Sequence, residues 1–313
     1  MPEEPTIGIT MGDAAGIGPE IVLKSLSDDR LRGQRCVVIG DGAYLRKASA
    51  DDSIEIFDVA NLPEQFEVGV DSAVTGKAAA EYIEAAVRLW REGKIDAIAT
   101  APISKTAIAL GGYDFPGHTE FLAKLTGTDK FAMSFFAEKL RVVLLTTHMP
   151  LRDAISLIKK DRLVELIRFA DTELGKILGR KVSLAAAGLN PHASEGGKFG
   201  SEERDEITPA IEECKAAGID VRGPHSPDTI FLRGHKGEFD AVIALYHDQA
   251  TIAVKSISFG SAVNVTLGLP LIRTSVDHGT AYDIAGKGIA DASSMTAAIR
   301  LAGELAICSR MDA

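Results

Sequence analysis

Residues 6–25 read TIGITMGDAAGIGPEIVLKS, which is an apolar strand candidate, a glycine-containing connection and a helix candidate in that order. We predict the strand over Thr6–Thr10 and the helix over Pro19–Ser25. The same order of a short apolar run and a longer helical pattern recurs along the chain. The runs are nearly continuous in Val, Ile, Ala and Leu, which is typical of parallel strands covered on both faces. The sequence therefore predicts parallel, doubly wound α/β layers.

The remaining elements are predicted on the same grounds. Further strands are expected at Arg35–Ile39, Ser53–Phe57, Ala97–Thr100, Arg141–Thr146, Val182–Ala186 and Ala241–Leu245. Further helices are expected at Lys77–Glu92, Leu151–Leu178 (as one helix or two), Asp205–Ala217 and Ser293–Cys308. Because no repeat and no Pro/Gly-rich linker marks a boundary, we expect two lobes connected by more than one crossing of the chain.

Composition limits the function classes. The chain has 313 residues, 46% hydrophobic and 25% charged, which fits one large or two ordinary globular domains. Its 34 Lys and Arg against 44 Asp and Glu give a net charge of −10, which disfavours nucleic acid and anionic membranes as partners. The three cysteines show no CxxC spacing, so neither a disulfide framework nor a cysteine zinc site is predicted. No apolar run reaches the ~20 residues of a membrane span and no signal peptide is visible, so a cytoplasmic location is expected.

Three histidines each follow a predicted strand. They are His148 in LLTTHMP, His192 in LNPHASEGG and His247 in AVIALYHDQ. Ligands collect at the carboxyl ends of parallel strands, so the three imidazoles can converge in one crevice. Three imidazoles suit a divalent first-row metal and leave coordination positions open for substrate. The residues alone favour equally the alternative that each histidine caps its own strand through a local hydrogen bond.

A second group of residues suits an anionic ligand. Pro116–Glu120 (PGHTE) is a short loop that opens a helix, where backbone N–H groups, His118 and Thr119 can face a phosphate. Further along the chain, three polar residues lie nine positions apart, which fits successive strand–turn segments that line one cleft: Lys255, Asn264 and Arg273. Lys and Arg in a cleft bind carboxylate or phosphate through charge-assisted bonds. Taken singly, Lys255 and Arg273 are better explained as solvated surface charges.

A third feature is the glycine-rich stretch His278–Gly288, HGTAYDIAGKG. Its glycines permit close backbone approach to a flat ligand, and Asp283 is able to accept hydrogen bonds from ribose or amide donors. The alternative from composition is a plain turn.

Long, ordered segments of the chain resemble the 4-hydroxythreonine-4-phosphate dehydrogenase family along nearly its whole length: MGDAAGIGPEI, TAPISK, PGHTEF, TTHMPL, GLNPHASEGGKFGSEE, ALYHDQ and VNVTLGLPLIRTSVDHGTAYDIAGKG. The loop His278–Gly288 is also similar to the adenine-side cofactor loop of isopropylmalate dehydrogenases. The resemblance implies an isopropylmalate-dehydrogenase-like α/β fold of two α/β/α lobes with a cleft between them. We expect the first lobe, with the cofactor loop, at residues 1–125 plus 265–313. The second lobe, with metal ligands and dimer contacts, is expected at residues 126–264.

The resemblance also implies the composition of the site. A divalent metal (Zn, or Mg, Mn or Co) is expected on His148, His192 and His247. NAD is expected on Gly279, Thr280, Asp283 and Gly286, with the acidic Asp283 favouring NAD over NADP. Substrate contacts fall on His118, Thr119, Lys255, Asn264 and Arg273, and Asp228 resembles a further active-site acid that shares candidate catalytic roles with Lys255. The family is homodimeric, with each active site built from both subunits.

The implied reaction is the metal- and NAD-dependent oxidation, with decarboxylation, of a small 4-phosphorylated 3-hydroxy acid. The GDAAG and TAPISK variants are similar to the family branch that acts on 4-phospho-D-threonate and 4-phospho-D-erythronate. One alternative is an aromatic cis-dihydrodiol dehydrogenase of the same family, against which the retention of His118, Thr119 and Lys255 argues. The others are a metal-dependent hydrolase, which would turn over without NAD, and a binding protein, which would not consume its ligand.

Overall fold

The computed structural model of the chain describes residues 4–49, 51–258 and 260–310. The chain divides into two compact units. Unit 1 takes the residues up to Phe131 together with Leu269–Cys308, and unit 2 is built on Ala132–Gly268. The chain therefore leaves unit 1 after residue 131 and re-enters it at residue 269, where the sequence places the boundaries at 125/126 and 264/265.

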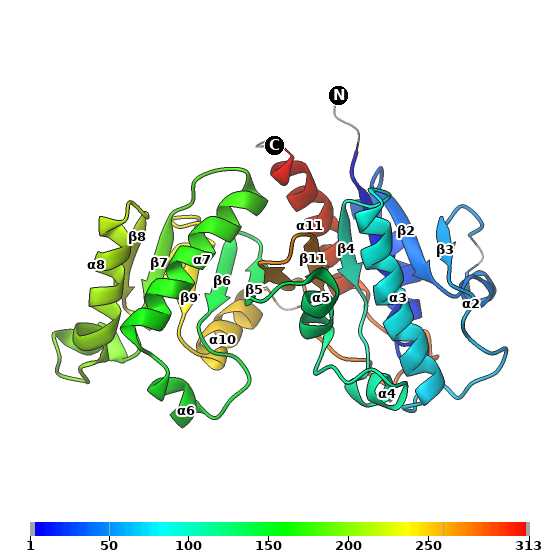
Figure 1. The fold of residues 1–313 in the computed structure, drawn as a ribbon, viewed down its shortest axis with the longest axis horizontal. Helices are drawn as coiled ribbons and strands as arrows, with labels where there is room; N and C mark the ends of the chain where they lie inside the picture. Colours follow the sequence, from blue (N-terminus) through cyan, green and yellow to red (C-terminus); the bar gives the residue numbers. More distant parts are fainter. Residues whose placement is uncertain (1–3, 50, 259, 311–313) are drawn as a thin grey trace. The chain divides into compact units, whose positions relative to one another are not determined.

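The strands of unit 1 run parallel in the order β3-β2-β1-β4-β11 (Figure 1). Their bounds are β1 Thr6–Thr10, β2 Arg35–Gly40, β3 Ile56–Asp58, β4 Ala97–Thr100 and β11 Ile272–Ser275. β1 is central, with Thr6 opposite Arg35 of β2 and Ile7 opposite Ala97 of β4. Ile7 and Ile9 are fully buried, as are both faces of β4, because helices cover the sheet.

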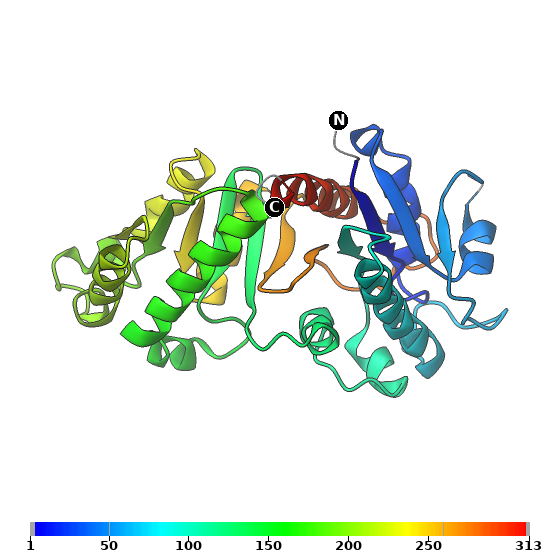
Figure 2. The same cartoon turned by 45° about the horizontal axis from the view of Figure 1, so that its top comes forward.

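The helices of unit 1 are α1 Gly18–Leu26, the 3-10 turn Asp29–Leu31, α2 Gly42–Ala48, α3 Ala73–Arg91, α4 Lys105–Leu110, α5 His118–Thr126 and α11 Ser293–Ser309. The long helix α3 begins at Ser72, whose side chain accepts a hydrogen bond from Thr75 N. It packs on β1 and β2 and contacts α4 and α5 (Figure 2). A Cβ at Gly76 would lie 1.8 Å from Ala107 O, so only glycine permits this approach of α3 to α4.

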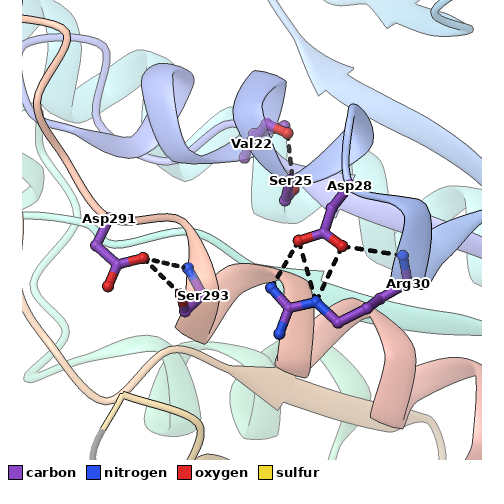
Figure 3. Close-up of polar contacts among 6 residues, drawn as sticks. All are labelled: Val22, Ser25, Asp28, Arg30, Asp291 and Ser293. Carbon is purple, nitrogen blue, oxygen red and sulfur yellow. Dashed lines mark hydrogen bonds and ion pairs between the residues drawn. The ribbon is translucent and has the colours of Figure 1, made fainter.

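Short polar contacts fix two helix ends in unit 1, shown in Figure 3. Asp28 caps the 3-10 turn by accepting from Arg30 N and is paired with the Arg30 side chain at 2.6 Å. This pairing lowers the pKa of Asp28 to about 2. At the start of α11, Asp291 accepts from both the backbone N and the hydroxyl of Ser293. These contacts set where the chain enters each helix.

The strands of unit 2 follow the order β10-β5-β6-β9-β7-β8. Their bounds are β5 Ala132–Ala137, β6 Leu140–Leu144, β7 Leu184–Ala187, β8 Val221–His225, β9 Ala241–Ala244 and β10 Val263–Leu267. β5 is antiparallel to both β6 and β10, so the expectation of an entirely parallel arrangement is wrong here. The reason is local, since β5 and β6 are joined through Glu138 and Lys139, and Glu138 adopts a left-handed φ of 53° that suits a tight hairpin.

The helices of unit 2 are α6 Leu151–Ser156, α7 Lys160–Leu178, the 3-10 turn η2 Pro191–Glu195, the π turn η3 Glu203–Ile207, α8 Thr208–Ala216, α9 Pro227–His235 and α10 His247–Ile257. The segment predicted as one helix or two is therefore two, α6 and α7. α7, the long green helix of Figures 1 and 2, packs against α8. None of the helices within the described ranges is both long enough and apolar enough to cross a membrane.

The α/β class predicted from the sequence is confirmed, and every predicted strand and helix is present, with the predicted ends in β1 and β4 and with shifted ends elsewhere. The strands that the sequence did not predict are β5, β8, β10 and β11. Each unit has its own buried apolar cluster: the first includes Ile9, Ile39 and Ile98, and the second includes Val142 and Val242. The three candidate metal histidines follow the carboxyl ends of strands β6, β7 and β9.

Candidate functional site

The histidine edge of unit 2, defined by His148, His192 and His247, lies at the carboxyl ends of three neighbouring strands. β6, β9 and β7 are adjacent and parallel, and each is followed by one of these histidines (Figure 1). The prediction that each histidine follows an apolar strand is confirmed. The three histidines follow adjacent strand ends because β9 lies between β6 and β7.

The structure brings two of the three imidazoles together. The ring centroids of His148 and His247 are 5.3 Å apart at an interplanar angle of 47°. They line a hollow of about 170 Å³ with residues 147–149, Leu151, Ala154 and 246–248. His247 Nδ1 lies 2.7 Å from the Asp248 carboxylate. This contact favours the tautomer with the proton on Nδ1, which leaves Nε2 available as a ligand.

His192 lies in the turn η2 and is exposed. It is not among the residues that line the hollow. Within the described ranges no three His, Cys, Asp or Glu side chains gather closely enough to hold a metal ion. The donor set fits a divalent cation in part, with two imidazoles facing one hollow and one ring oriented by a carboxylate. The three-histidine site stays a prediction.

Three further predicted residues lie in unit 2. Asp228 is exposed in the first turn of α9 and accepts from Ser226 Oγ at 2.6 Å, and α9 packs against η2, the turn of His192. Lys255 is exposed on α10, the helix that begins at His247. Asn264 is on β10, and its buried Oδ1 has no hydrogen-bonding partner among the described residues.

The interpretation of the nine-residue spacing is wrong. Lys255 is in a helix, Asn264 is in an antiparallel strand of unit 2, and Arg273 is in β11 of unit 1. The three residues are therefore not in repeated strand–turn segments. The equal spacing follows from the lengths of α10, of the loop between α10 and β10, and of β10, and it does not reflect a structural repeat.

The anion corner of unit 1 is formed by His118, Thr119 and Arg273. His118 and Thr119 are the first two residues of α5, where the helix dipole favours an anion. Arg273 is only 3% exposed, and its Nε and Nη2 donate to Thr100 Oγ1 at 3.2 and 2.9 Å. His118 Nε2 is buried without a hydrogen-bonding partner among the described residues.

Burial sets the electrostatics of this corner. It lowers the pKa of Arg273 to about 10, against the opposing effect of Glu120. It also holds the pKa of His118 well below 6.5, and the charge of Arg273 lowers that pKa further. His118 is therefore neutral near pH 7. A bound anion would place a further negative charge near Arg273 and give His118 Nε2 a partner, so the corner fits a phosphate or carboxylate.

The loop His278–Gly288, which we call the cofactor loop, is held against the connection between β1 and α1. Thr280 O accepts from Ile17 N at 2.9 Å, and a Cβ at Gly16 would lie 2.9 Å from Thr280. Tyr282 OH lies 2.7 Å from Asp13 Oδ2 and 3.0 Å from Asp71 Oδ1. Burial, followed by the bond to Asp13, raises the pKa of Tyr282.

The predicted cofactor residues lie on the outside of this loop. Gly279, Asp283 and Gly286 are exposed and Thr280 is half-buried. Gly286 has φ of 73°, the left-handed conformation that favours glycine. The exposed backbone fits the close approach of a flat ligand, and Asp283 presents its carboxylate to solvent.

Several supporting contacts have no counterpart in the sequence-based prediction. Lys24 Nζ donates to Gly288 O and Ala290 O, which fastens the far end of the cofactor loop to α1. Gln249 and Glu203 contact the loops of the histidine edge. The only sequence signal for Gln249 is its place two residues after His247, and that for Glu203 is the Glu–Glu pair after the His192 segment.

Comparison with known proteins identifies the family. Residues 20–302 match the family described as "Pyridoxal phosphate biosynthetic protein PdxA". A D-threonate 4-phosphate dehydrogenase of Cupriavidus necator is 47% identical, covering 96% of this chain and 97% of the relative. A 4-hydroxythreonine-4-phosphate dehydrogenase of Geobacter metallireducens is 43% identical, covering 97% and 96%.

A solved structure is similar over the same extent. The crystal structure of 4-hydroxythreonine-4-phosphate dehydrogenase from Klebsiella pneumoniae has a TM-score of 0.89 at 42% identity, and covers 97% of this chain and 98% of that one. The family match and these relatives cover most of the chain, including residues of both units. The chain belongs to the PdxA family of pyridoxal phosphate biosynthetic proteins.

Proposed function

We propose that the chain is a metal- and NAD-dependent dehydrogenase that oxidises the 3-hydroxyl of a small 4-phosphorylated acid, with decarboxylation. The observation that carries the proposal is the anion corner. A buried guanidinium beside a neutral, partly unsatisfied imidazole at a helix start suits a compact dianion. The names of the relatives, which are dehydrogenases of phosphorylated hydroxy acids, support the same substrate class.

The candidate site residues have separate roles in this proposal. Arg273, His118 and Thr119 bind the phosphate, and Asn264 binds a further polar group of the substrate. Lys255 and Asp228 are assigned to proton transfer or substrate orientation. The exposed cofactor loop, with Gly279, Thr280, Asp283 and Gly286, would bind NAD, which accepts the hydride.

The histidine edge would hold a divalent metal, Zn, Mg, Mn or Co, through His148, His192 and His247. When bound, such a metal supplies Lewis-acid chemistry that lowers the pKa of a coordinated hydroxyl and polarises a carbonyl. The contact of Asp248 with His247 Nδ1 keeps that ring in the tautomer suited to a ligand. We further propose a homodimer with active sites built from both subunits, and a cytoplasmic location.

Among phosphorylated acids we propose 4-phospho-D-threonate or 4-phospho-D-erythronate over 4-hydroxythreonine-4-phosphate. The GDAAG and TAPISK variants support this order. The Cupriavidus necator D-threonate 4-phosphate dehydrogenase, at 47% identity against 43%, points the same way.

The test is a substrate panel assayed for nicotinamide reduction with and without added Zn²⁺, Mg²⁺ or Mn²⁺. It includes the phosphorylated acids, their dephosphorylated forms and an aromatic cis-diol. The phosphate makes charged hydrogen bonds, each contributing about 1.5–3 kcal/mol, so dephosphorylated acids should lose at least ~100-fold in kcat/KM. Equal turnover of free threonate or of the cis-diol would refute the phosphate site. Substrate hydrolysis without NAD would refute the dehydrogenase.

A further inference from the structure

At the histidine edge, the side chain of Gln249 takes over from backbone hydrogen bonding where strands β7 and β9 separate. β7 and β9 pair through the backbone from Leu184 opposite Ala241 to Ala186 opposite Ile243. Beyond that register, Gln249 Oε1 accepts from Leu245 N at 2.7 Å, and Gln249 Nε2 donates to Gly188 O at 2.8 Å. The amide of Gln249 thus occupies the place of a peptide group between the two strand ends.

The neighbouring strands do not separate in this way. On one side of the gap, Leu145 N donates to Ala244 O at 2.8 Å, which continues the pairing of β6 with β9. On the other side, Gly188 N donates to His225 O at 2.8 Å, which continues the pairing of β7 with β8. The opening is therefore confined to the gap between β7 and β9. The chain leaves these two strands toward His192 and His247.

A buried carboxylate holds the segment that leads from β7 to His192. Glu203 is 3% exposed, and its Oε1 accepts from Leu189 N at 2.8 Å and from Asn190 N at 2.7 Å. Its Oε2 accepts from Asn190 Nδ2 at 2.9 Å. Three donors on two successive residues thus converge on one ionisable group, which fixes both the direction and the register of the segment.

The turn that follows has an unfavourable backbone. His192, Ala193, Ser194 and Glu195 have consecutive φ values of 54°, 52°, 63° and 45°. Side chains with a Cβ rarely adopt this left-handed region, and a run of them persists only where surrounding contacts determine it. Gly188 makes room for the turn, because a Cβ there would lie 3.0 Å from Ala193 Cα.

We propose that Gln249 and Glu203 are positioning residues that preset the His192 turn and its spacing from His247 for binding of a divalent cation. Neither side chain is a ligand. Gln249 sets the separation of the two strand ends, and Glu203 holds the chain in the conformation that leads into the turn. The inference rests on the proposed metal function of the histidine edge. Without these two side chains, the ordering of the turn would have to accompany cation binding, which weakens affinity.

The experiment measures the Zn²⁺ dissociation constant by competition with a chromophoric chelator, on the full-length protein without NAD or substrate. The test variants are Gln249→Met and Glu203→Gln, which preserve side-chain volume. The matched controls are Gln34→Met, whose amide also bonds a backbone carbonyl, and Glu206→Gln, which also accepts a backbone N–H, from Lys160. His247→Ala is the reference for loss of a ligand.

We expect Zn²⁺ binding to weaken 10- to 100-fold in Gln249→Met and Glu203→Gln, the range typical for outer partners of metal ligands, and less than about 3-fold in the controls. Adding Zn²⁺ should raise Tm less in the variants that bind Zn²⁺ more weakly. The Tm measured without Zn²⁺ should not correlate with Zn²⁺ affinity across the variants. Wild-type affinity in both test variants, with binding lost in His247→Ala, overturns this inference alone. Wild-type affinity in His247→Ala overturns the proposed metal site itself. Equal losses in test and control variants would mean general destabilisation, and also overturn the inference.

Discussion

His118 in unit 1 lies in a different environment from His148 and His192 in unit 2. His118 is half-buried at a helix start beside the buried Arg273, and its pKa is held well below 6.5. His148 and His192 are exposed on loops beyond strand ends. The anion corner is thus enclosed by buried groups, whereas the histidine edge is more open and takes its geometry from contacts behind it. Under the proposed function, imidazole would be a neutral donor in unit 1 and a metal ligand in unit 2.

The largest effect should come from removing a histidine of the edge. His192→Ala or His247→Ala should weaken Zn²⁺ binding more than ~100-fold, because a direct ligand contributes more than an outer partner, and should abolish turnover. Since neither imidazole is in the core, Tm without metal should change little. Metal content, kcat and Tm are the measurements, with His235→Ala as a control in the same unit. Full activity of either variant in chelator-treated buffer would contradict the assignment.

The next effect tests the anion corner. Arg273→Met should lower kcat/KM for the phosphorylated acid by ~10- to 100-fold, because one charged hydrogen bond contributes about 1.5–3 kcal/mol. It should leave kcat/KM for the dephosphorylated acid nearly unchanged, so discrimination between the two collapses. Arg300→Met, which removes an exposed arginine of α11, is the control. If discrimination survives in Arg273→Met, the phosphate lies elsewhere.

A smaller effect, on the KM for NAD, distinguishes the cofactor loop from the anion corner and the histidine edge. Asp283→Asn should raise the KM for NAD by ~2- to 10-fold, as expected for one exposed hydrogen bond, and leave Zn²⁺ affinity unchanged. Steady-state kinetics at saturating acid give the KM, and the exposed Asp52→Asn is the control. Unchanged cofactor kinetics would show that Asp283 does not contact NAD.

The smallest effect is a pH dependence of stability that follows from the environment of the His118 imidazole. The pKa of His118 is lowered on folding, so the unfolded chain binds the extra proton, and stability falls as pH drops below about 6.5. Above that pH its contribution is fully present. His118→Gln should therefore flatten part of the acid slope of the unfolding free energy, measured by denaturation at a series of pH values. Added phosphate should raise the pKa of His118, measured by NMR, and an unmoved resonance would contradict its role in anion binding.

The sequence predicts strands best where burial is complete. Thr6–Thr10 and Ala97–Thr100 have the predicted bounds because helices cover both faces of these strands. β8 was not predicted because its residues, VRGPH, form no apolar run and include Gly and Pro. β5 and β10 form an antiparallel pair, and that pairing depends on contacts about 130 residues apart along the chain, such as Ser134 Oγ to Val265 O.

The candidate site also has residues that local sequence predicts and residues that it does not. The three histidines could be placed at strand ends from local pattern alone. Gln249 could not be assigned, because its bond to Gly188 spans 61 residues and exists only because β9 lies next to β7. The burial of Arg273 likewise follows from its position on β11, paired with β4, and not from its own segment. Tertiary neighbours thus decide which polar residues support the site.

The division of unit 1 into two stretches of chain has a consequence during synthesis. The main stretch of unit 2, Ala132–Gly268, is continuous and precedes β11, so it is synthesised before β11. Until then β4 is paired only with β1, and its other edge is unprotected. An unpaired edge of this kind is a template for association with other chains, so the nascent protein is most vulnerable to aggregation along β4. Arg273 arrives on the strand that covers this edge, so the anion corner and the protection of the nascent chain are completed in the same step.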